Sequence, residues 1–467
     1  MNPIKKLAGQ TAIYGFSSVI GRLLNYLLVP LYTRYFLPSE YGVVTEIYAY
    51  VAFLVVILTY GMEVTFFRFL KKEYDEDTVF STTLISIVTT SLVFIGLVFV
   101  NSQGIAEWMG YQKNKEYVEW FAIIVGLDAI SAISFAKLRA QYKALQFTII
   151  RLINIFTNIS LNLYFIIVQG FGIEYIFISN LIASIITVII LLPVMFKSRW
   201  TFDSNLWRKM LIYAIPLVIA GLAGITNETL DRILLKHYLV NSSNYFSEVG
   251  LYGAFYKLSI IMILFIQTFR YAAEPFFFAQ EKKDNAKENY ALVMKYFIII
   301  TAIIFLTVTT YYDFIKSFLG SEYHDERGFL VVSILLLANL FLGVYYNLSV
   351  WYKLTDQTKY GAYISIFGAV ITIVFNICLI PKIGFIGSAW ATLICYFSMV
   401  LVSYLIGRRF YPIPYEVRKI TGYLVLMLAL FFLSQNLSFG MLVNSIYILI
   451  FVSIVILAEK ITIRIPK

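Results

Sequence analysis

The stretch VFSTTLISIVTTSLVFIGLVFVN, residues 79–101, carries no charged side chain from one end to the other. A helix needs about 20 apolar residues to cross the ~30 Å hydrocarbon core of a bilayer. Only helices and closed barrels satisfy their backbone polar groups there. We therefore expect a membrane-crossing helix here, and thirteen further apolar stretches predict the same: 10–35, 42–67, 118–137, 147–168, 173–196, 210–234, 249–271, 291–315, 329–351, 360–380, 385–406, 420–435 and 441–458.

The composition agrees with such a chain. Hydrophobic residues make up 60% of the 467 residues and charged residues only 14%, whereas soluble domains carry about a quarter charged residues. The short gaps between the apolar stretches leave no room for a sizeable aqueous domain. The predicted fold class is an all-α polytopic membrane protein with 14 transmembrane helices.

The distribution of positive charge predicts the orientation in the membrane. Lys and Arg gather at the N-terminus and in every second loop, as in Arg68–Lys71–Lys72 and Arg408–Arg409. Loops rich in Lys and Arg stay on the cytoplasmic side, so both termini are expected there. The net charge of +10 is thus explained by membrane topology, and no nucleic-acid partner is expected.

The second half of the chain repeats the first. NLYFIIVQGFG, starting at Asn162, returns as NICLIPKIGFIG, starting at Asn376, which pairs Gly170 with Gly384. Such repeats are typical of transporters, and copies with the same orientation are related by a pseudo-two-fold axis along the membrane normal. The sequence predicts two six-helix bundles, residues 1–205 and 206–412, followed by two additional helices in residues 413–467.

Two stretches carry a resemblance to a known family. GFSSVIGRLLNYLLVPLYTRYFLPSEYGVV, residues 15–44, and NICLIPKIGFIGSAWAT, residues 376–392, resemble signatures of bacterial polysaccharide transporters. These belong to the multidrug/oligosaccharidyl-lipid/polysaccharide (MOP) exporter superfamily. The resemblance implies an O-antigen-unit flippase of the bacterial inner membrane, whose cargo is an undecaprenyl-pyrophosphate-linked glycan. A polysaccharide polymerase or glycosyltransferases are the protein partners to expect, and the chain is expected to be a monomer.

Ionisable residues inside the bilayer are costly and mark functional sites by default. Arg22 lies near the middle of the first predicted span, with Asn25 one helical turn further on. One interpretation is a cation that binds the substrate phosphate in a central cleft. The other is a buried ion pair between Arg22 and Asp128.

Three more cations are candidates for the same cleft. Lys257 faces Arg22 across the cleft in one interpretation, and pairs with Glu228 or Asp231 in the other. Arg151 and Arg270, together with Lys295, lie close enough to the predicted cytoplasmic ends of their spans to reach the headgroups. For these three, headgroup contact and a role at a cytoplasmic gate both remain open.

The acidic residues predict a gate or local ion pairs. Glu63 and Glu274 occupy matching positions of the repeat, and Arg68 and Arg270 lie about one turn from them. Either pair closes the cytoplasmic side in one state or only neutralises charge locally. Asn227, the repeat partner of Asn25, is a further candidate.

No nucleotide-binding loop, metal-ligand spacing or catalytic cluster occurs in the sequence, so we expect no enzyme activity, no metal and no cofactor. Movement of cargo then depends on Na+, H+ or the membrane potential, and alternating access is the expected mechanism. Two rival functions share the fold. A lipid II flippase fits the same charges, whereas a cation-coupled multidrug antiporter would require acidic residues in the cleft, and the first span contains none.

Overall fold

The computed structural model describes residues 20–21, 23–70, 74–239, 244–281, 283–436 and 441–460. It divides the chain into two compact units, Met1–Ile233 and Leu234–Lys467, which are described separately below. Within the described residues the secondary structure is helical throughout. Twelve of these helices are long and apolar enough to cross a membrane.

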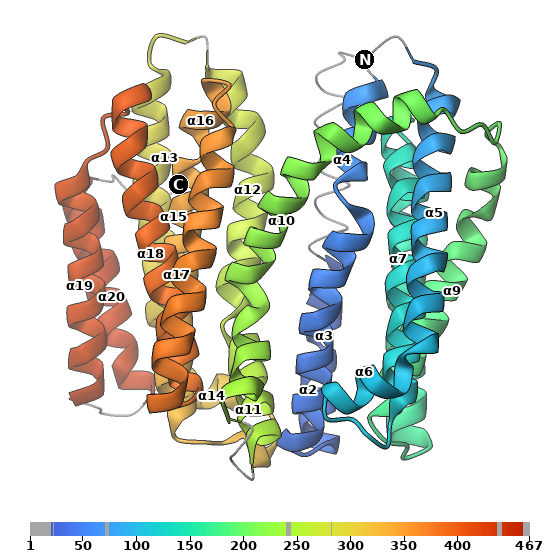
Figure 1. The fold of residues 1–467 in the computed structure, drawn as a ribbon. Coiled ribbons are helices and arrows are strands. Elements are labelled where there is room, and N and C mark those ends of the chain that lie inside the picture. Colours follow the sequence, from blue (N-terminus) through green and yellow to red (C-terminus); the bar gives the residue numbers. More distant parts are fainter. Residues whose placement is uncertain are drawn as a thin grey trace, which may run out of the picture. The chain divides into compact units, whose positions relative to one another are not determined.

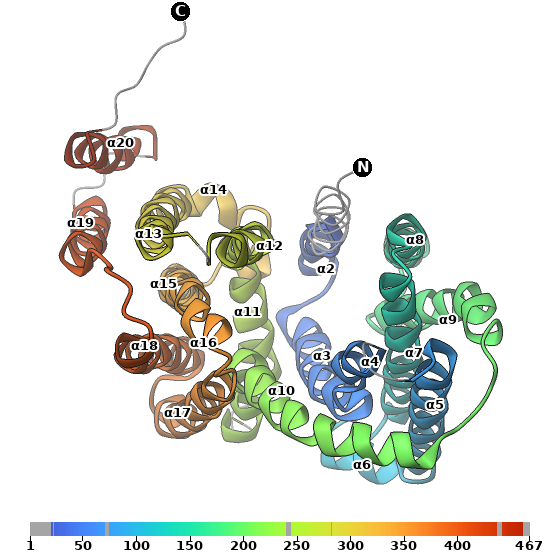
Figure 2. The same ribbon diagram turned by 90° about the horizontal axis from the view of Figure 1, so that it is seen from above.

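The first unit is built around one central helix (Figures 1 and 2). α7 packs against α3, α5 and α9. Of the residues in its most apolar 18-residue stretch, 72% are buried. The helices of this unit are α2 (Leu28–Tyr35), α3 (Pro38–Thr59), α4 (Met62–Leu70), α5 (Glu76–Val100), α6 (Ser102–Trp108), α7 (Lys115–Ala140), α8 (Ala144–Asn162) with its π-helical extension Leu163–Val168, α9 (Glu174–Phe196) and α10 (Ser204–Leu239), whose last residues belong to the second unit.

The second unit also has a central helix, α15. As in α7, 72% of the residues in its most apolar 18-residue stretch are buried. Its neighbours include α13 and α18. The helices of this unit are α11 (Tyr245–Leu258), α12 (Ile260–Gln280), α13 (Ala286–Thr310), α14 (Tyr312–Lys316), α15 (Arg327–Leu348), α16 (Val350–Leu354), α17 (Lys359–Ile383), α18 (Phe385–Phe410), α19 (Val417–Asn436) and α20 (Met441–Ala458), with a short 3₁₀ turn at Ser321–Tyr323.

Local sequence explains where several helices begin and end. Pro38 opens α3, and the Glu40 carboxylate accepts a hydrogen bond from the backbone N–H of Leu37 at 2.8 Å. Asp75 accepts from the N–H of Thr78 at the start of α5. Such side chains satisfy the free N–H groups of a helix N-terminus. α3 ends at Tyr60 and Gly61, both with positive φ, so the second predicted span continues as a separate helix, α4.

The repeat is visible in the structure. Asn162 and Asn376 are both fully buried, and each side-chain amide donates to the carbonyl four residues earlier, that of Asn158 or Thr372. Gly170 and Gly384 have similar positive φ angles, +67° and +60°. A positive φ is accessible to glycine at little cost.

The expected all-α membrane fold is confirmed, but the count of 14 spans is not. Of the first predicted span, 10–35, residues 10–19 and 22 lie outside the described residues, and its end is seen as α2. The last corresponds to α20, whose apolar part, Asn444–Ala458, is shorter than the twelve helices counted as spans. The predicted span 249–271 also differs from the structure. The helix is interrupted at Ser259, between α11 and α12, and α12 then continues to Gln280.

Candidate functional site

Arg22, the central cation of the sequence-based hypothesis, lies outside the described residues. Asn25 is described and is exposed, whereas its repeat partner Asn227 is buried. The two asparagines therefore have different surroundings. The predicted phosphate-binding role of Arg22, and its alternative pairing with Asp128, both stay predictions.

Arg151 is an exposed cation within a membrane-crossing helix. It lies seven residues after the start of α8, or about 10 Å along the helix axis at 1.5 Å per residue. Its guanidinium stacks over the ring of Phe135, 4.5 Å from the centroid, and lies 5.7 Å from that of Phe147. No hydrogen bond or ion pair joins it to another described residue, so its five N–H donors are available to a ligand.

Asp128 lies at the middle of α7 and is half-buried. Its carboxylate accepts a hydrogen bond from the hydroxyl of Ser184 on α9 at 2.9 Å. Among the described residues it forms no ion pair, and Arg151 is the cation whose field it experiences.

Glu63 has a different partner from the one expected. At the start of α4 it forms an ion pair with Arg139, in the last turn of α7. Arg68 instead places its guanidinium over the ring of Tyr213, 4.3 Å from the centroid. The predicted local pairing of Glu63 with Arg68 is therefore wrong, because α7 brings a nearer cation from a distant part of the chain.

The equivalent acid of the second unit, Glu274, interacts with two cations. Its carboxylate is 2.7 Å from the ammonium of Lys353 and 3.6 Å from the guanidinium of Arg270. Arg270 also stacks on Tyr346, 4.0 Å from the ring centroid. With two cations and one carboxylate, this cluster retains a positive charge.

The Arg270 cluster borders a small, shallow hollow at the surface of α12. Aromatic side chains such as Phe269 and Phe277 line it beside the charged groups. Arg270 lies ten residues from either end of α12, which is deeper than the sequence suggested. Headgroup contact and a role at a cytoplasmic gate both stay predictions for this arginine.

Lys257, Glu228 and Asp231 complete the predicted set. Lys257 lies half-buried in the last turn of α11, and Glu228 is exposed on α10. Asp231 is buried, and its carboxylate is 3.0 Å from the guanidinium of the adjacent Arg232. Arg232 lies inside the predicted span 210–234 but was not among the predicted cations, and α10 continues beyond that span to Leu239.

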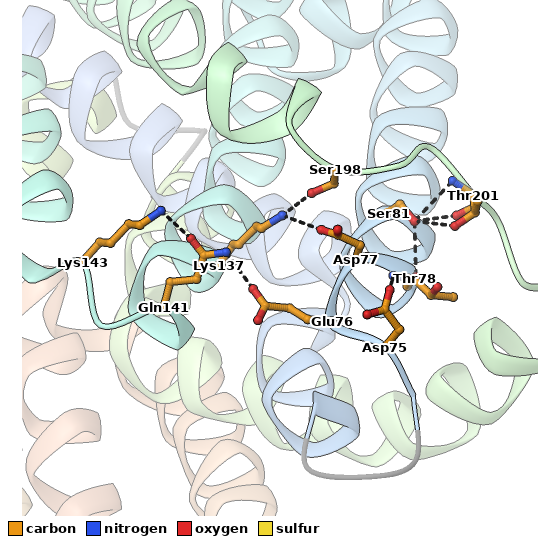
Figure 3. A network of polar contacts seen from close by, with 10 residues as sticks. All are labelled: Asp75, Glu76, Asp77, Thr78, Ser81, Lys137, Gln141, Lys143, Ser198 and Thr201. Atoms are coloured by element: carbon orange, nitrogen blue, oxygen red, sulfur yellow. Dashed lines mark hydrogen bonds and ion pairs between the residues drawn. The ribbon is translucent and has the colours of Figure 1, made fainter. Parts of the chain in front are cut away.

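A further buried cation of the first unit, Lys137, was also missed (Figure 3). Its side chain is 5% exposed, and its ammonium lies 3.1 Å from the Asp77 carboxylate and bonds to the hydroxyl of Ser198. Next to it, Gln141 donates to Glu76 at 2.8 Å. These contacts join the start of α5, the end of α7 and the segment after α9, which indicates a structural role.

Lys295 has a comparable position in the second unit. Its ammonium lies 2.8 Å from a Glu416 oxygen and 2.6 Å from a Glu459 oxygen. The side chain is only 5% exposed, so it does not extend to the headgroups as one interpretation expected. It joins α13 to the start of α19 and the end of α20.

The repeat offset could have revealed two of the missed cations. Arg139 and Lys353, the partners of Glu63 and Glu274, are 214 positions apart, as are Asn162 and Asn376. The predicted spans ended at 137 and 351, which left both cations in loops. A search for charges at matching repeat positions would have placed each beside its acid.

Comparisons with known proteins agree with this fold. The chain is similar to a lipid II flippase MurJ in an inward closed conformation, with a TM-score of 0.74 and 15% identity over 96% of this chain and 99% of that one. It is also similar to a multidrug resistance MATE family transporter of the MOP superfamily in an inward-facing conformation. There the TM-score is 0.67, with 13% identity over 85% and 94% of the two chains.

A third similar structure is a mutant of the Vibrio cholerae MATE transporter VcmN, with a TM-score of 0.60 and 13% identity over 87% and 96% of the two chains. No curated protein matches the chain at a significant level. Together, the helical units and these structures define a multi-pass helical fold that is similar to that of MurJ and the MATE transporters. Residues 7–280 match the polysaccharide biosynthesis protein family, and the chain belongs to that family.

Proposed function

We propose that this protein is a flippase that moves polyprenyl-pyrophosphate-linked glycan units across the bacterial cytoplasmic membrane for surface polysaccharide synthesis. Arg151 is the observation that carries the proposal. Arg151 is an exposed residue of a membrane-crossing helix, and its guanidinium, with no described carboxylate paired to it, is suited to bind a phosphate through charge-assisted hydrogen bonds. Membership in the polysaccharide biosynthesis family supports a glycan cargo.

The Arg270 cluster supports the same ligand chemistry in the second unit. It presents two cations against one carboxylate, beside aromatic rings. The cations match the charge of a pyrophosphate, and aromatic side chains offer apolar contact to sugar rings. In this mechanism a cation binds the headgroup while the lipid tail stays in the bilayer, and alternating access re-exposes the headgroup on the other side.

Substitution of Arg151 tests the proposal. A strain lacking this protein would be complemented with the wild type, Arg151→Ala or Arg151→Lys, and lipid-linked glycan would be measured on each side of the membrane. We expect Arg151→Ala to lose export while membrane levels stay normal, and Arg151→Lys to retain part of it, since lysine keeps the charge without the bidentate fork. Wild-type export by Arg151→Ala would refute the proposal.

A lipid II flippase is the second candidate, because MurJ covers 96% of the chain at a TM-score of 0.74. The charge requirement is the same for both cargoes. Depletion of the host's own lipid II flippase distinguishes them. Growth restored by this chain would favour cell-wall synthesis, whereas continued dependence on the host protein, with surface glycan restored, would favour the proposed function.

A further inference from the structure

The structure contains a carboxylate at the centre of the first unit that the proposed function does not use. Asp128 is thirteen residues from the start of α7 and twelve from its end, about 18–20 Å from either end at 1.5 Å per residue. Its hydrogen-bond partner is a neutral hydroxyl, that of Ser184. An ionised carboxylate at this depth with one neutral donor is poorly stabilised.

Three further polar groups around Asp128 are neutral. Asn180, one turn before Ser184 on α9, donates to the hydroxyl of Tyr48 on α3 at 2.9 Å. Tyr48 experiences the field of Asp128. On α7 itself, the hydroxyl of Ser131 is buried without a hydrogen-bond partner. These surroundings accommodate the protonated, uncharged acid more readily than the carboxylate.

Arg151 is the described cation whose charge acts on this carboxylate, without direct contact. Asp128 and Phe135 are seven residues apart, so they share one face of α7 about 10 Å apart. The guanidinium of Arg151 rests on Phe135. The other charges that act on Arg151 are Glu63 and Arg139, which already neutralise each other.

We propose that Asp128 is a proton-binding site that controls whether Arg151 is free to hold an anionic headgroup. When Asp128 is ionised, its carboxylate attracts the guanidinium of Arg151, which then competes with a phosphate. When the carboxylate takes up a proton, it becomes neutral and Arg151 is released to the ligand. The structure, with Arg151 on Phe135 and no Asp128–Arg151 ion pair, corresponds to the released arrangement.

This inference rests on the proposed function, because it assumes that Arg151 binds the phosphate. Thermodynamic linkage requires that proton binding by Asp128 and anion binding affect each other equally. Protonation of Asp128 raises the affinity for the anion, and binding of the anion draws a proton onto Asp128. The site therefore gives this chain a specific residue through which pH and cargo binding are coupled.

The test measures binding of a glycan-free polyprenyl diphosphate to the full chain in nanodiscs across a pH series, with inorganic pyrophosphate as a second probe. For the wild type we expect the affinity to fall about tenfold or more as the pH rises. Asp128→Asn, which mimics the neutral acid, should bind tightly at every pH. Arg151→Ala should bind weakly at every pH. Glu119→Gln, near the start of the same helix, is the matched control and should retain the wild-type pH dependence.

A second measurement does not depend on the ligand. Infrared difference spectroscopy should detect a protonated carboxyl group in the wild type that is missing from Asp128→Asn. Absence of that signal would overturn the proton site, as would unchanged pH dependence in Asp128→Asn. Dependence on Na+ at fixed pH that Asp128→Asn abolishes would assign the site to sodium instead. Tight binding by Arg151→Ala would instead refute the proposed function.

Discussion

Lys295 and Glu459 form a buried ion pair that joins α13 to the end of α20. The ammonium and a carboxylate oxygen are 2.6 Å apart, and the two side chains are 5% and 6% exposed. Glu459 also accepts hydrogen bonds from Tyr423 and from Lys419 of α19. This network is therefore a polar connection between the last two helices and the rest of the second unit.

Substitution of Lys295 should loosen this connection. Removing one partner of a buried ion pair leaves an uncompensated charge and is destabilising by about 3 kcal/mol or more. We expect Lys295→Met to lower the thermal unfolding temperature of the purified protein. The double variant Lys295→Met/Glu459→Met should recover part of the loss, because no unpaired carboxylate remains. A double variant less stable than Lys295→Met would contradict this explanation.

The same network predicts a loss of stability in acid. Burial favours a higher pKa for Glu459, but hydrogen bonds from Lys295, Tyr423 and Lys419 outweigh it and lower the pKa to about 2. Hydrogen bonds from Lys295 and Lys419 also lower the pKa of Glu416. Because both values lie below the ordinary 4.5, the stabilisation is complete above pH 4.5 and declines as the pH falls toward 2.

Hydrogen exchange of α19 and α20 measures this effect. We expect exchange at the start of α19 and the end of α20 to accelerate as the pH falls below 4.5, after correction for the intrinsic rate. Lys295→Met should show fast exchange already at neutral pH and a weaker dependence on acid. Equal pH profiles for the two proteins would exclude the network as the cause.

Gly384 should not tolerate a side chain. Its φ of +60° and ψ of −143° belong to a region that is essentially restricted to glycine. Gly384→Ala should cost about 1–3 kcal/mol, seen as a lower unfolding temperature. Gly422, inside α19 with open space around it, is the control, and Gly422→Ala should be neutral or slightly stabilising. Equal losses from the two variants would contradict a backbone origin.

The Glu63–Arg139 pair should matter more for transport than for stability. Both side chains are partly exposed, 42% and 32%, and such pairs contribute about 0.2–1 kcal/mol. We expect Glu63→Gln to leave the unfolding temperature nearly unchanged and to reduce the export of lipid-linked glycan, because the pair also sets the charge near Arg151. Normal export by Glu63→Gln would leave the pair without a functional role.

Much of the fold could be predicted from the sequence because membrane helices are specified locally. The stretch 79–101 was expected as a span, and α5 extends from Glu76 to Val100. The repeat predicted the matching backbone of Gly170 and Gly384. Breaks inside spans, such as that at Ser259, were missed because the apolar pattern continues across them.

Less of the candidate site than of the fold could be predicted from the sequence. The sequence indicated that Arg151 and Asp128 are charges at membrane depth, but not that Phe135 supports the first and Ser184 the second. It also assigned Glu63 to Arg68, a neighbour in sequence, rather than to Arg139. Pairings between helices depend on which faces meet, and local spacing carries no information on that.

The sequence by itself determined that this chain crosses a membrane many times, in two related halves, and that it holds ionisable residues at depth. These properties follow from the length and apolar character of single helices and from a repeated pattern. Only the tertiary structure decided which charges are neutralised, as Lys295 is by Glu459, and which stay available, as Arg151 does. Neutralisation requires two side chains from different helices to come within a few ångströms, and helix packing alone brings them there.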